Sequence, residues 1–313
     1  MSLVTDNTAT LRSTLPRSTK SGGWLSSLLM RFEALRGYLL LSPTLLIMII
    51  GICVPLFILV GMSLWTQHGF EFDKSLTLAN YFNVAEQPIY KALLARSILI
   101  SGGCALATVI LSYPMAYFVA FHVHRHKMVW IILMTLPFWT SYLLRVFSWK
   151  IILGYNGVIN SGLIGMGLID QPLEFLLYSP LAVVITLTHA WSAFAILPIY
   201  VSLEKIDRSL LEAATDLGDG PVRRFFRITF PMSLPGVIAA ALIIFIPTVG
   251  DYITPTLLGG PDGIMLANLI SAQFGKVNDW PMGAALAIAL MVTVALFSVV
   301  FVIISRKVTE RIT

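Results

Sequence analysis

Charged residues are scarce in this sequence. Only 12% of its 313 residues are Asp, Glu, Lys or Arg, whereas 57% are apolar. Soluble proteins carry roughly twice that share of charge, and the mean hydropathy of +0.83 points the same way. The composition therefore predicts a chain embedded in lipid. No polar stretch is long enough to form a sizeable soluble domain, which argues against a membrane-anchored enzyme or scaffold.

Motifs of catalysis and metal binding are also missing. The sequence contains no G-x-x-x-x-G-K-[ST] phosphate-binding loop, no nucleophile elbow and no H-E-x-x-H. Its two cysteines, Cys53 and Cys104, lie in apolar stretches without metal-ligand spacing, and we interpret them as packing residues. These absences predict a chain that is not an enzyme, holds no cofactor or metal and cannot use ATP by itself.

Six apolar runs are long enough to cross a bilayer, which requires roughly 20 residues at about 1.5 Å each. They are Tyr38 to Met62, Leu93 to Phe121, Met128 to Leu153, Pro180 to Leu203, Leu234 to Leu258 and Ala284 to Ser305. We therefore expect an all-α polytopic membrane protein with six transmembrane helices.

Basic residues alternate between the connecting segments, and basic loops are retained on the cytoplasmic side. Fifteen Lys and Arg residues lie in the N-terminal tail, the loops after the second and fourth runs, and the C-terminus. The opposing loops carry only Lys74, Lys91 and Lys276. We therefore expect both termini in the cytoplasm. The net charge of +5 then reflects topology and contact with membrane lipid, and not nucleic-acid binding, because the basic residues form no continuous stripe.

The same pattern divides the chain into three parts. Residues 1–37 form a cytoplasmic tail that begins Ser/Thr-rich and then places Leu25, Leu28, Leu29, Phe32 and Leu35 at helical spacing. This spacing suits a helix along the membrane surface, or an extension of the first span. Residues 38–305 make the six-span domain, with a long cytoplasmic loop at 204–233, and residues 306–313 form a short C-terminal tail.

Asp251 is the most informative charge within the apolar runs. It lies 17 residues into the fifth run, beside Tyr252. An ionisable group at membrane depth usually faces a pathway or a partner, so both are candidate substrate-pathway residues; a structural ion pair or an outer-edge position are the alternatives. Arg145 is a candidate partner of Asp251 and a further pathway residue, unless it snorkels to the interface. Trp191, in the fourth run, completes this candidate set.

The loop between the fourth and fifth runs is patterned beyond its charge. Its sequence is EKIDRSLLEAATDLGDGPVRRFFRITFPMSLPG. Residues from Leu210 to Leu217 predict a short helix that Gly218 ends, and a second segment starts at Val222. A helix with Ala213 and Ala214 exposed could enter a partner's groove, whereas an amphipathic loop on the membrane surface would explain the same composition.

The segment EAATDLG, followed by nine residues and then ITFP, resembles the E-A-A-x3-G-x9-I-x-L-P signature of binding-protein-dependent ABC importer permeases. Phe230 replaces the leucine of that signature. The resemblance implies that this loop is a coupling helix that docks into an ATPase subunit. The expected ATPase-coupling residues are Glu212, Ala213, Ala214, Asp216, Gly218, Ile228 and Pro231.

Two further stretches, FIPTVGDYITPTLLGG and NDWPMGAALAIAL, are similar to the spermidine/putrescine-type branch of these permeases, as is the region from Phe138 to Asn160. The resemblance implies a type I ABC importer (MetI-like) permease in the bacterial inner membrane. Its expected partners are two copies of an ATP-binding subunit, a second, homologous permease and an extracytoplasmic substrate-binding protein. The expected cargo is a polyamine or a related amine, opine or amino-acid derivative.

An ion- or proton-coupled secondary transporter is the alternative function. Its intramembrane charges would then carry protons or sodium. Such carriers often contain paired broken helices in two repeated halves, and this sequence has no convincing internal repeat.

Overall fold

The computed structural model describes residues 33–69 and 71–312. The chain divides into two units, residues 1–58 and 59–313, and the boundary falls within the first described helix, α2 (Glu33–Ser63). The Ser/Thr-rich start of the tail and most of the surface helix expected near its end lie outside the described residues.

After α2, the chain forms one short hairpin and is otherwise helical between its loops. The first half contains β1 (Thr66–His68), β2 (Glu71–Asp73), α3 (Ala79–Glu86), α4 (Pro88–Phe121), α5 (Lys127–Thr135), the 3-10 turn η1 (Leu136–Trp139), α6 (Tyr142–Ile152) and α7 (Val158–Gly165). The second half contains the 3-10 turn η2 (Glu174–Leu176), α8 (Pro180–Glu204), α9 (Arg208–Asp216), α10 (Pro221–Arg224), the π-turn η3 (Phe225–Thr229), α11 (Phe230–Val249), the π-turn η4 (Pro255–Gly259), α12 (Gly260–Gly263), α13 (Leu266–Ala272), the π-turn η5 (Gln273–Val277) and α14 (Trp280–Ile312).

Five of the described helices are long and apolar enough to cross a membrane, and a bent helix pair raises the number to six. The five lie at Leu40–Ser63, Pro88–Phe121, Pro180–Glu204, Pro221–Val249 and Trp280–Lys307. They match five of the six apolar runs identified in the sequence.

The third apolar run was expected to form one helix. In the structure it forms two helical parts that meet at a bend. Lys127–Trp139 and Tyr142–Ile152 meet at an angle of 81°. Pro137 lacks a backbone donor. Thr140 and Ser141, the two residues that follow η1, have non-helical backbone angles that end the helical hydrogen bonding. The second half of this run therefore turns aside as α6.

The fifth span ends earlier than predicted. Helix α11 stops at Val249, with Gly250 as its C-cap, although the apolar run continues to Leu258. Asp251 consequently lies just beyond the end of a helix and not inside one. The helical hydrogen-bond pattern starts again near Pro255. A break at this point leaves backbone groups that side chains must satisfy.

Helices α4, α8 and α11 pack against one another and form the core of the second unit. Small residues let them approach closely. At Gly236 of α11, an added Cβ would lie 2.5 Å from the carbonyl oxygen of Pro198 and 2.5 Å from Cβ of Ser202, both in α8. Only glycine fits at this crossing.

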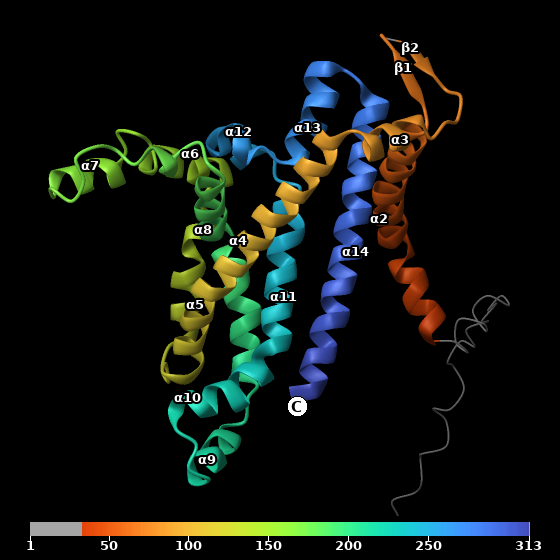
Figure 1. Cartoon of the computed structure of the whole chain (residues 1–313). Coiled ribbons are helices and arrows are strands. Elements are labelled where there is room, and N and C mark those ends of the chain that lie inside the picture. The colour runs from red at the N-terminus through yellow and green to blue at the C-terminus, as the bar shows by residue number, and fades with distance from the viewer. Residues whose placement is uncertain (1–32, 70, 313) are drawn as a thin grey trace, which may run out of the picture. The chain divides into compact units, whose positions relative to one another are not determined.

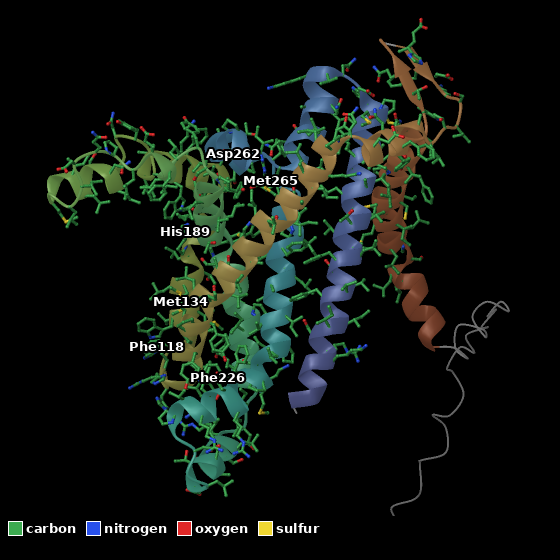
Figure 2. All side chains as sticks on the ribbon, viewed as in Figure 1. Phe118, Met134, His189, Phe226, Asp262 and Met265 are labelled. Carbon is green, nitrogen blue, oxygen red and sulfur yellow. The ribbon has the colours of Figure 1, made fainter. Side chains whose placement is uncertain are left out.

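The second unit has two distinct ends. In Figure 1, α9 and α10 lie at one end, together with the C-terminal end of α14, while α6, α7, α12 and α13 lie at the other. Figure 2 shows the same separation for labelled side chains: Phe226 lies beside α9 and α10, and Asp262 and Met265 lie at the opposite end. The helices α9 and α10 and the helices α6 and α12 therefore lie at opposite ends of the second unit.

Candidate functional site

Three of the four predicted pathway residues meet at one cavity of about 390 Å³. Arg145 of α6, Trp191 of α8 and Asp251 after α11 all line it. The other lining residues are mostly aromatic or apolar: Phe138, Tyr142, Ala190, Phe194 and Pro247. The cavity therefore combines one carboxylate, one guanidinium group and four aromatic rings.

The carboxylate of Asp251 is held on both oxygens. Its Oδ1 accepts hydrogen bonds from the backbone N–H groups of Ile253 (2.9 Å) and Thr254 (3.4 Å), so it caps the segment that follows the break. Its Oδ2 accepts from the hydroxyl of Tyr142 at 2.6 Å. That hydroxyl also lies 2.6 Å from the hydroxyl of Thr254. This network fixes the carboxylate at the cavity wall.

Arg145 is buried, but it forms no ion pair with Asp251 in the described chain. Its Nη1 donates to the carbonyl oxygen of Ala190 at 2.9 Å, and its guanidinium carbon lies 5.3 Å from the ring centre of Phe138 and 6.0 Å from that of Tyr142. A direct ion pair between Arg145 and Asp251, one of the alternatives left open by the sequence, is therefore not formed in the described chain. The hydrogen bond and the ring contacts orient the guanidinium group instead.

Two donors of the cavity residues lack an acceptor within the described chain. They are Nε of Arg145 and Nε1 of Trp191. Trp191 packs beside Phe194 and Tyr142, with ring centres 5.5 Å and 6.5 Å apart. Buried donors without acceptors are costly, so a water molecule or a ligand with an acceptor would be favoured here.

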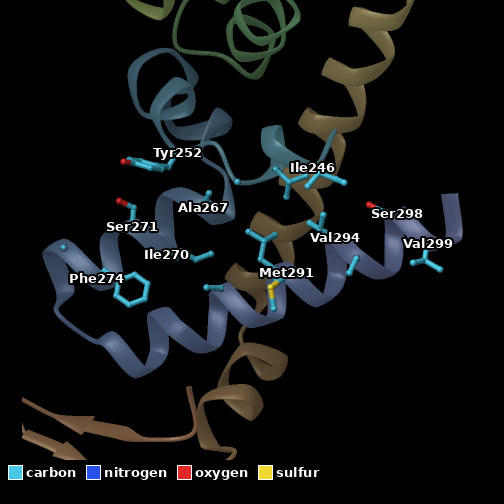
Figure 3. Close-up of a pocket in the computed structure, with 16 residues that line it drawn as sticks. Ile246, Tyr252, Ala267, Ile270, Ser271, Phe274, Met291, Val294, Ser298 and Val299 are labelled. Carbon is cyan, nitrogen blue, oxygen red and sulfur yellow. The ribbon is translucent and has the colours of Figure 1, made fainter. Parts of the chain in front are cut away.

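Tyr252, the fourth predicted pathway residue, does not line this cavity. It is exposed and faces a larger hollow of about 980 Å³ between α11, α13 and α14 (Figure 3). The walls of that hollow are almost entirely apolar, and Ile246, Ile270, Met291 and Val294 are among them. The structure therefore separates Tyr252 from its sequence neighbour Asp251.

Sequence reasoning did not nominate Tyr142, Phe138 or Phe194. Tyr142 is the residue that bonds directly to Asp251. Aromatic residues are common in membrane helices, so nothing in the local pattern distinguishes these three. The rings of Phe138 and Phe194 meet edge to face, with centres 4.4 Å apart, and both line the cavity.

The second candidate site is the segment between α8 and α11. Asp207 caps α9, because its Oδ1 accepts from the backbone N–H of Ser209 at 2.9 Å. This hydrogen bond lowers the pKa of Asp207, because it stabilises the ionised carboxylate. The negative charge also lies favourably at the helix N-terminus.

Gly218 ends α9 in the left-handed region, with φ of +87°. The N–H of Asp219 donates to the carbonyl oxygen of Ala214, and the N–H of Gly218 donates to that of Thr215, both at 2.9 Å. These two bonds form a Schellman motif, which glycine accommodates without strain. The predicted stop at Gly218 is therefore confirmed.

The signature residues divide into exposed and buried groups. Glu212, Ala213 and Asp216 are exposed on α9, whereas Ala214 is buried. The expectation that both alanines are exposed is therefore wrong for Ala214, because α9 folds back against the π-turn η3. The two later residues are covered as well: Ile228 is half-buried in η3, and Pro231 is buried at the start of α11.

An aromatic cluster joins this segment to the core. The ring of Phe225 lies 5.7 Å from that of Tyr113 and 6.1 Å from that of Tyr117, both on α4. The hydroxyl of Tyr113 is also 2.9 Å from that of Ser233 on α11. Through Phe225, η3 therefore packs directly against α4, and Tyr113 links α4 to α11.

The family comparison decides how these two sites are understood. Residues 23–313 match the family model described as the binding-protein-dependent transport system inner membrane component. The chain belongs to this family. It is the membrane permease subunit of a binding-protein-dependent transport system, and it is located in a membrane.

Several relatives of this chain are spermidine/putrescine permeases. The chain is 34% identical over 266 residues to the spermidine/putrescine transport system permease protein PotB of Escherichia coli (strain K12), covering 85% of this chain and 96% of the relative. It is also 34% identical over 255 residues to PotB of Haemophilus influenzae, covering 81% and 88%. The predicted resemblance to the spermidine/putrescine branch is therefore confirmed.

Solved permeases share the fold. The chain superposes with a TM-score of 0.71 and 17% identity on a chain of the bacterial alginate ABC transporter in complex with an alginate pentasaccharide-bound periplasmic protein, covering 91% of this chain and 98% of the other. A second alginate ABC transporter structure gives a TM-score of 0.66, also at 17% identity. The predicted architecture, an all-α importer permease, is confirmed.

Proposed function

We propose that this permease carries a small amine, with a polyamine as the first candidate, and that α9 couples it to a separate ATPase. The observation that carries the cargo proposal is the position of Asp251, a carboxylate at the wall of a cavity with four aromatic rings. Ammonium groups bind favourably beside carboxylates and over aromatic faces. The similarity to PotB supports the same class of cargo.

Arg145 limits how tightly such a cargo would be held. Its guanidinium group shares the cavity with Asp251, so the two formal charges balance. A transported ion must bind well enough to enter and weakly enough to leave. One ammonium group near Asp251 and repulsion from Arg145 would meet both requirements.

Nε of Arg145 and Nε1 of Trp191 lack an acceptor in the described chain, and they favour a different kind of cargo from a polyamine. They suit a carboxylate, which polyamines lack and which opines and amino-acid derivatives carry. Competition among these compounds therefore identifies the cargo within the proposed class of amines.

The coupling proposal rests on the exposed face of α9. Glu212, Ala213 and Asp216 lie there, at the end of the unit opposite to α12 and α13 (Figure 1). A short helix with a small side chain at its centre can enter a groove on a partner. ATP would then close two ATPase subunits, α9 would follow them, and the core helices would change the accessible side of the pathway.

Six spans would line only half of a pathway, so we propose a second, homologous permease as partner. An extracytoplasmic binding protein would deliver the cargo, and both termini would lie in the cytoplasm with α9. Coupling requires that ATP and the loaded binding protein each favour one conformation, because a ligand with equal affinity for both shifts nothing. This chain itself would bind no ATP.

Uptake of labelled spermidine by vesicles that contain the complete transporter tests the cargo proposal. Asp251→Asn is expected to lower uptake on the order of tenfold, the equivalent of roughly 1.4 kcal/mol, while ATPase co-purification and basal ATP hydrolysis stay unchanged. Asp170→Asn, an exposed carboxylate in another loop, is the matched control. Normal uptake by Asp251→Asn, or competition by amino acids but not by polyamines, would contradict the proposal.

A further inference from the structure

Asp219 is a buried carboxylate between two exposed arginines. Its side chain is only 5% exposed, whereas those of Arg223 and Arg227 are 73% and 62% exposed. Oδ1 lies 3.1 Å from Nε of Arg223 in an ion pair, and Oδ2 accepts a hydrogen bond from Nη1 of Arg227 at 3.2 Å. Each carboxylate oxygen thus has its own cationic partner.

The backbone delivers Asp219 to this position. It is the residue after Gly218, and its N–H closes the Schellman motif onto Ala214 at 2.9 Å. Asp219 therefore belongs to the end of α9, while Arg223 lies in α10 and Arg227 in η3. The two ion pairs connect the end of α9 to the continuous helical segment that runs from α10 through η3 into α11.

A second contact also joins this helical segment to α9. Nη1 of Arg224 donates to the hydroxyl of Thr215 at 2.7 Å, but this bond is exposed and involves only one charged group. Exposed contacts are weak and screened by salt. A buried carboxylate that accepts one charge-assisted hydrogen bond and forms a second ion pair has a narrower range of geometries.

We propose that Asp219 is a positioning residue that fixes the angle between α9 and the continuous helical segment Pro221–Val249. Because the angle is fixed, a displacement of α9 moves α11 instead of bending the turn at Gly218. The inference deepens the proposed coupling function and rests on it for its functional consequence. The claim that the angle is fixed concerns this chain alone and does not depend on the ATPase.

A distance measurement tests the geometric part. Spin labels are placed on the full-length chain at Leu210→Cys in α9 and Ile243→Cys in α11, two exposed positions, with Cys53 and Cys104 replaced by alanine. Double electron–electron resonance should give a narrow distance distribution for the unmodified loop. Asp219→Asn should broaden or shift it, and Asp170→Asn should not. An unchanged distribution in Asp219→Asn would overturn the proposal.

The complete transporter tests the functional part. Asp219→Asn should keep ATPase co-purification and the thermal midpoint, but cargo moved per ATP hydrolysed should fall by about fivefold or more, the lower end of typical coupling between sites. Arg227→Gln should act in the same direction, and adding it to Asp219→Asn should cause little further loss, since Asp219→Asn already removes the Asp219–Arg227 ion pair. A broadened distribution with normal transport per ATP would overturn the transmission role.

The result also separates this inference from the proposed function. If the unmodified chain does not bind an ATPase through α9, the coupling function is wrong, whatever the distance distribution. If the unmodified chain binds and couples normally while Asp219→Asn behaves like the control in both measurements, only the role of Asp219 is wrong.

Discussion

The hydroxyl of Tyr142 lies 2.6 Å from Oδ2 of Asp251, although 109 positions separate the two residues in the chain. The contact joins the start of α6 to the break after α11. Both residues line the same cavity, so the bond orients the one carboxylate there. It also ties the bent third span to the fifth.

Tyr142→Phe removes the only side chain that donates to this carboxylate oxygen in the described chain. Hydrogen bonds to charged groups contribute about 1.5–3 kcal/mol, so we expect spermidine uptake to fall on the order of tenfold. The carboxylate would rotate or recruit water. Assembly with the ATPase should remain normal, as judged by co-purification. Uptake equal to that of the unmodified transporter would show that the bond does not orient Asp251.

Gly236→Ala should destabilise the core by about 1–3 kcal/mol, the usual cost of overpacking. The new Cβ would meet the backbone oxygen of Pro198 at 2.5 Å, and backbone cannot move aside as a flexible side chain can. The thermal midpoint of the purified protein measures this effect. Gly103→Ala on α4 is the matched control, because its Cβ would meet no atom within 4 Å. A midpoint loss shared by both variants would contradict the packing argument.

Gly218→Val should weaken ATPase binding more than Gly218→Asn. The residue has φ of +87°, where an ordinary side chain costs about 1–2 kcal/mol and asparagine costs less. An added Cβ would meet no atom within 4 Å, so the difference reflects backbone conformation alone. Co-purification of the ATPase with each variant checks the order. Equal retention by both variants would mean that the turn is not needed for docking.

Lys127 and Glu204 form an ion pair of 2.8 Å that joins the start of α5 to the end of α8. Both side chains are partly exposed, so after allowing for solvent screening we expect a coupling of about 1 kcal/mol or less. Thermal midpoints of Lys127→Gln, Glu204→Gln and the double variant measure it at low and high salt. The coupling should shrink as salt rises; one that salt leaves unchanged would point to a different interaction.

Much of the fold could be predicted because apolar runs of membrane-spanning length are visible in the sequence. Four runs lie within single helices, and the fifth run lies in α11 only as far as Val249. The fourth run starts at Pro180, as α8 does. The size of the 81° bend after Trp139 could not be predicted, because prolines such as Pro137 are tolerated in membrane helices and need not break them. The end of α11 at Val249 was hidden in the same way, since Gly250 and Pro255 are both tolerated in membrane helices.

The candidate cavity could be predicted in part. Asp251, Arg145 and Trp191 were each nominated because charge or a polar ring is unusual in an apolar run, and the structure places them together. Their arrangement depends on tertiary packing, so the choice of Tyr142 over Arg145 as the partner of Asp251 could not be derived. Tyr252 was nominated only as a sequence neighbour, and a break in the helix directs it elsewhere.

The structure of the coupling segment, residues 204–233, could also be predicted only in part. Its helix and its glycine stop follow from local rules, which act within a few residues. The burial of Ala214 depends on how α9 folds back onto η3, and that contact is not encoded in any short motif.

Photo-crosslinking in the assembled transporter tests the central claim most directly. Benzoylphenylalanine replaces Leu217, which is 82% exposed at the end of α9, and, as a control, Tyr155, which is 55% exposed between α6 and α7 at the other end of the unit. Illumination should join the Leu217 position to the ATPase subunit and leave the Tyr155 position unlinked to it. ATP-driven uptake without any ATPase adduct at the Leu217 position would contradict the account.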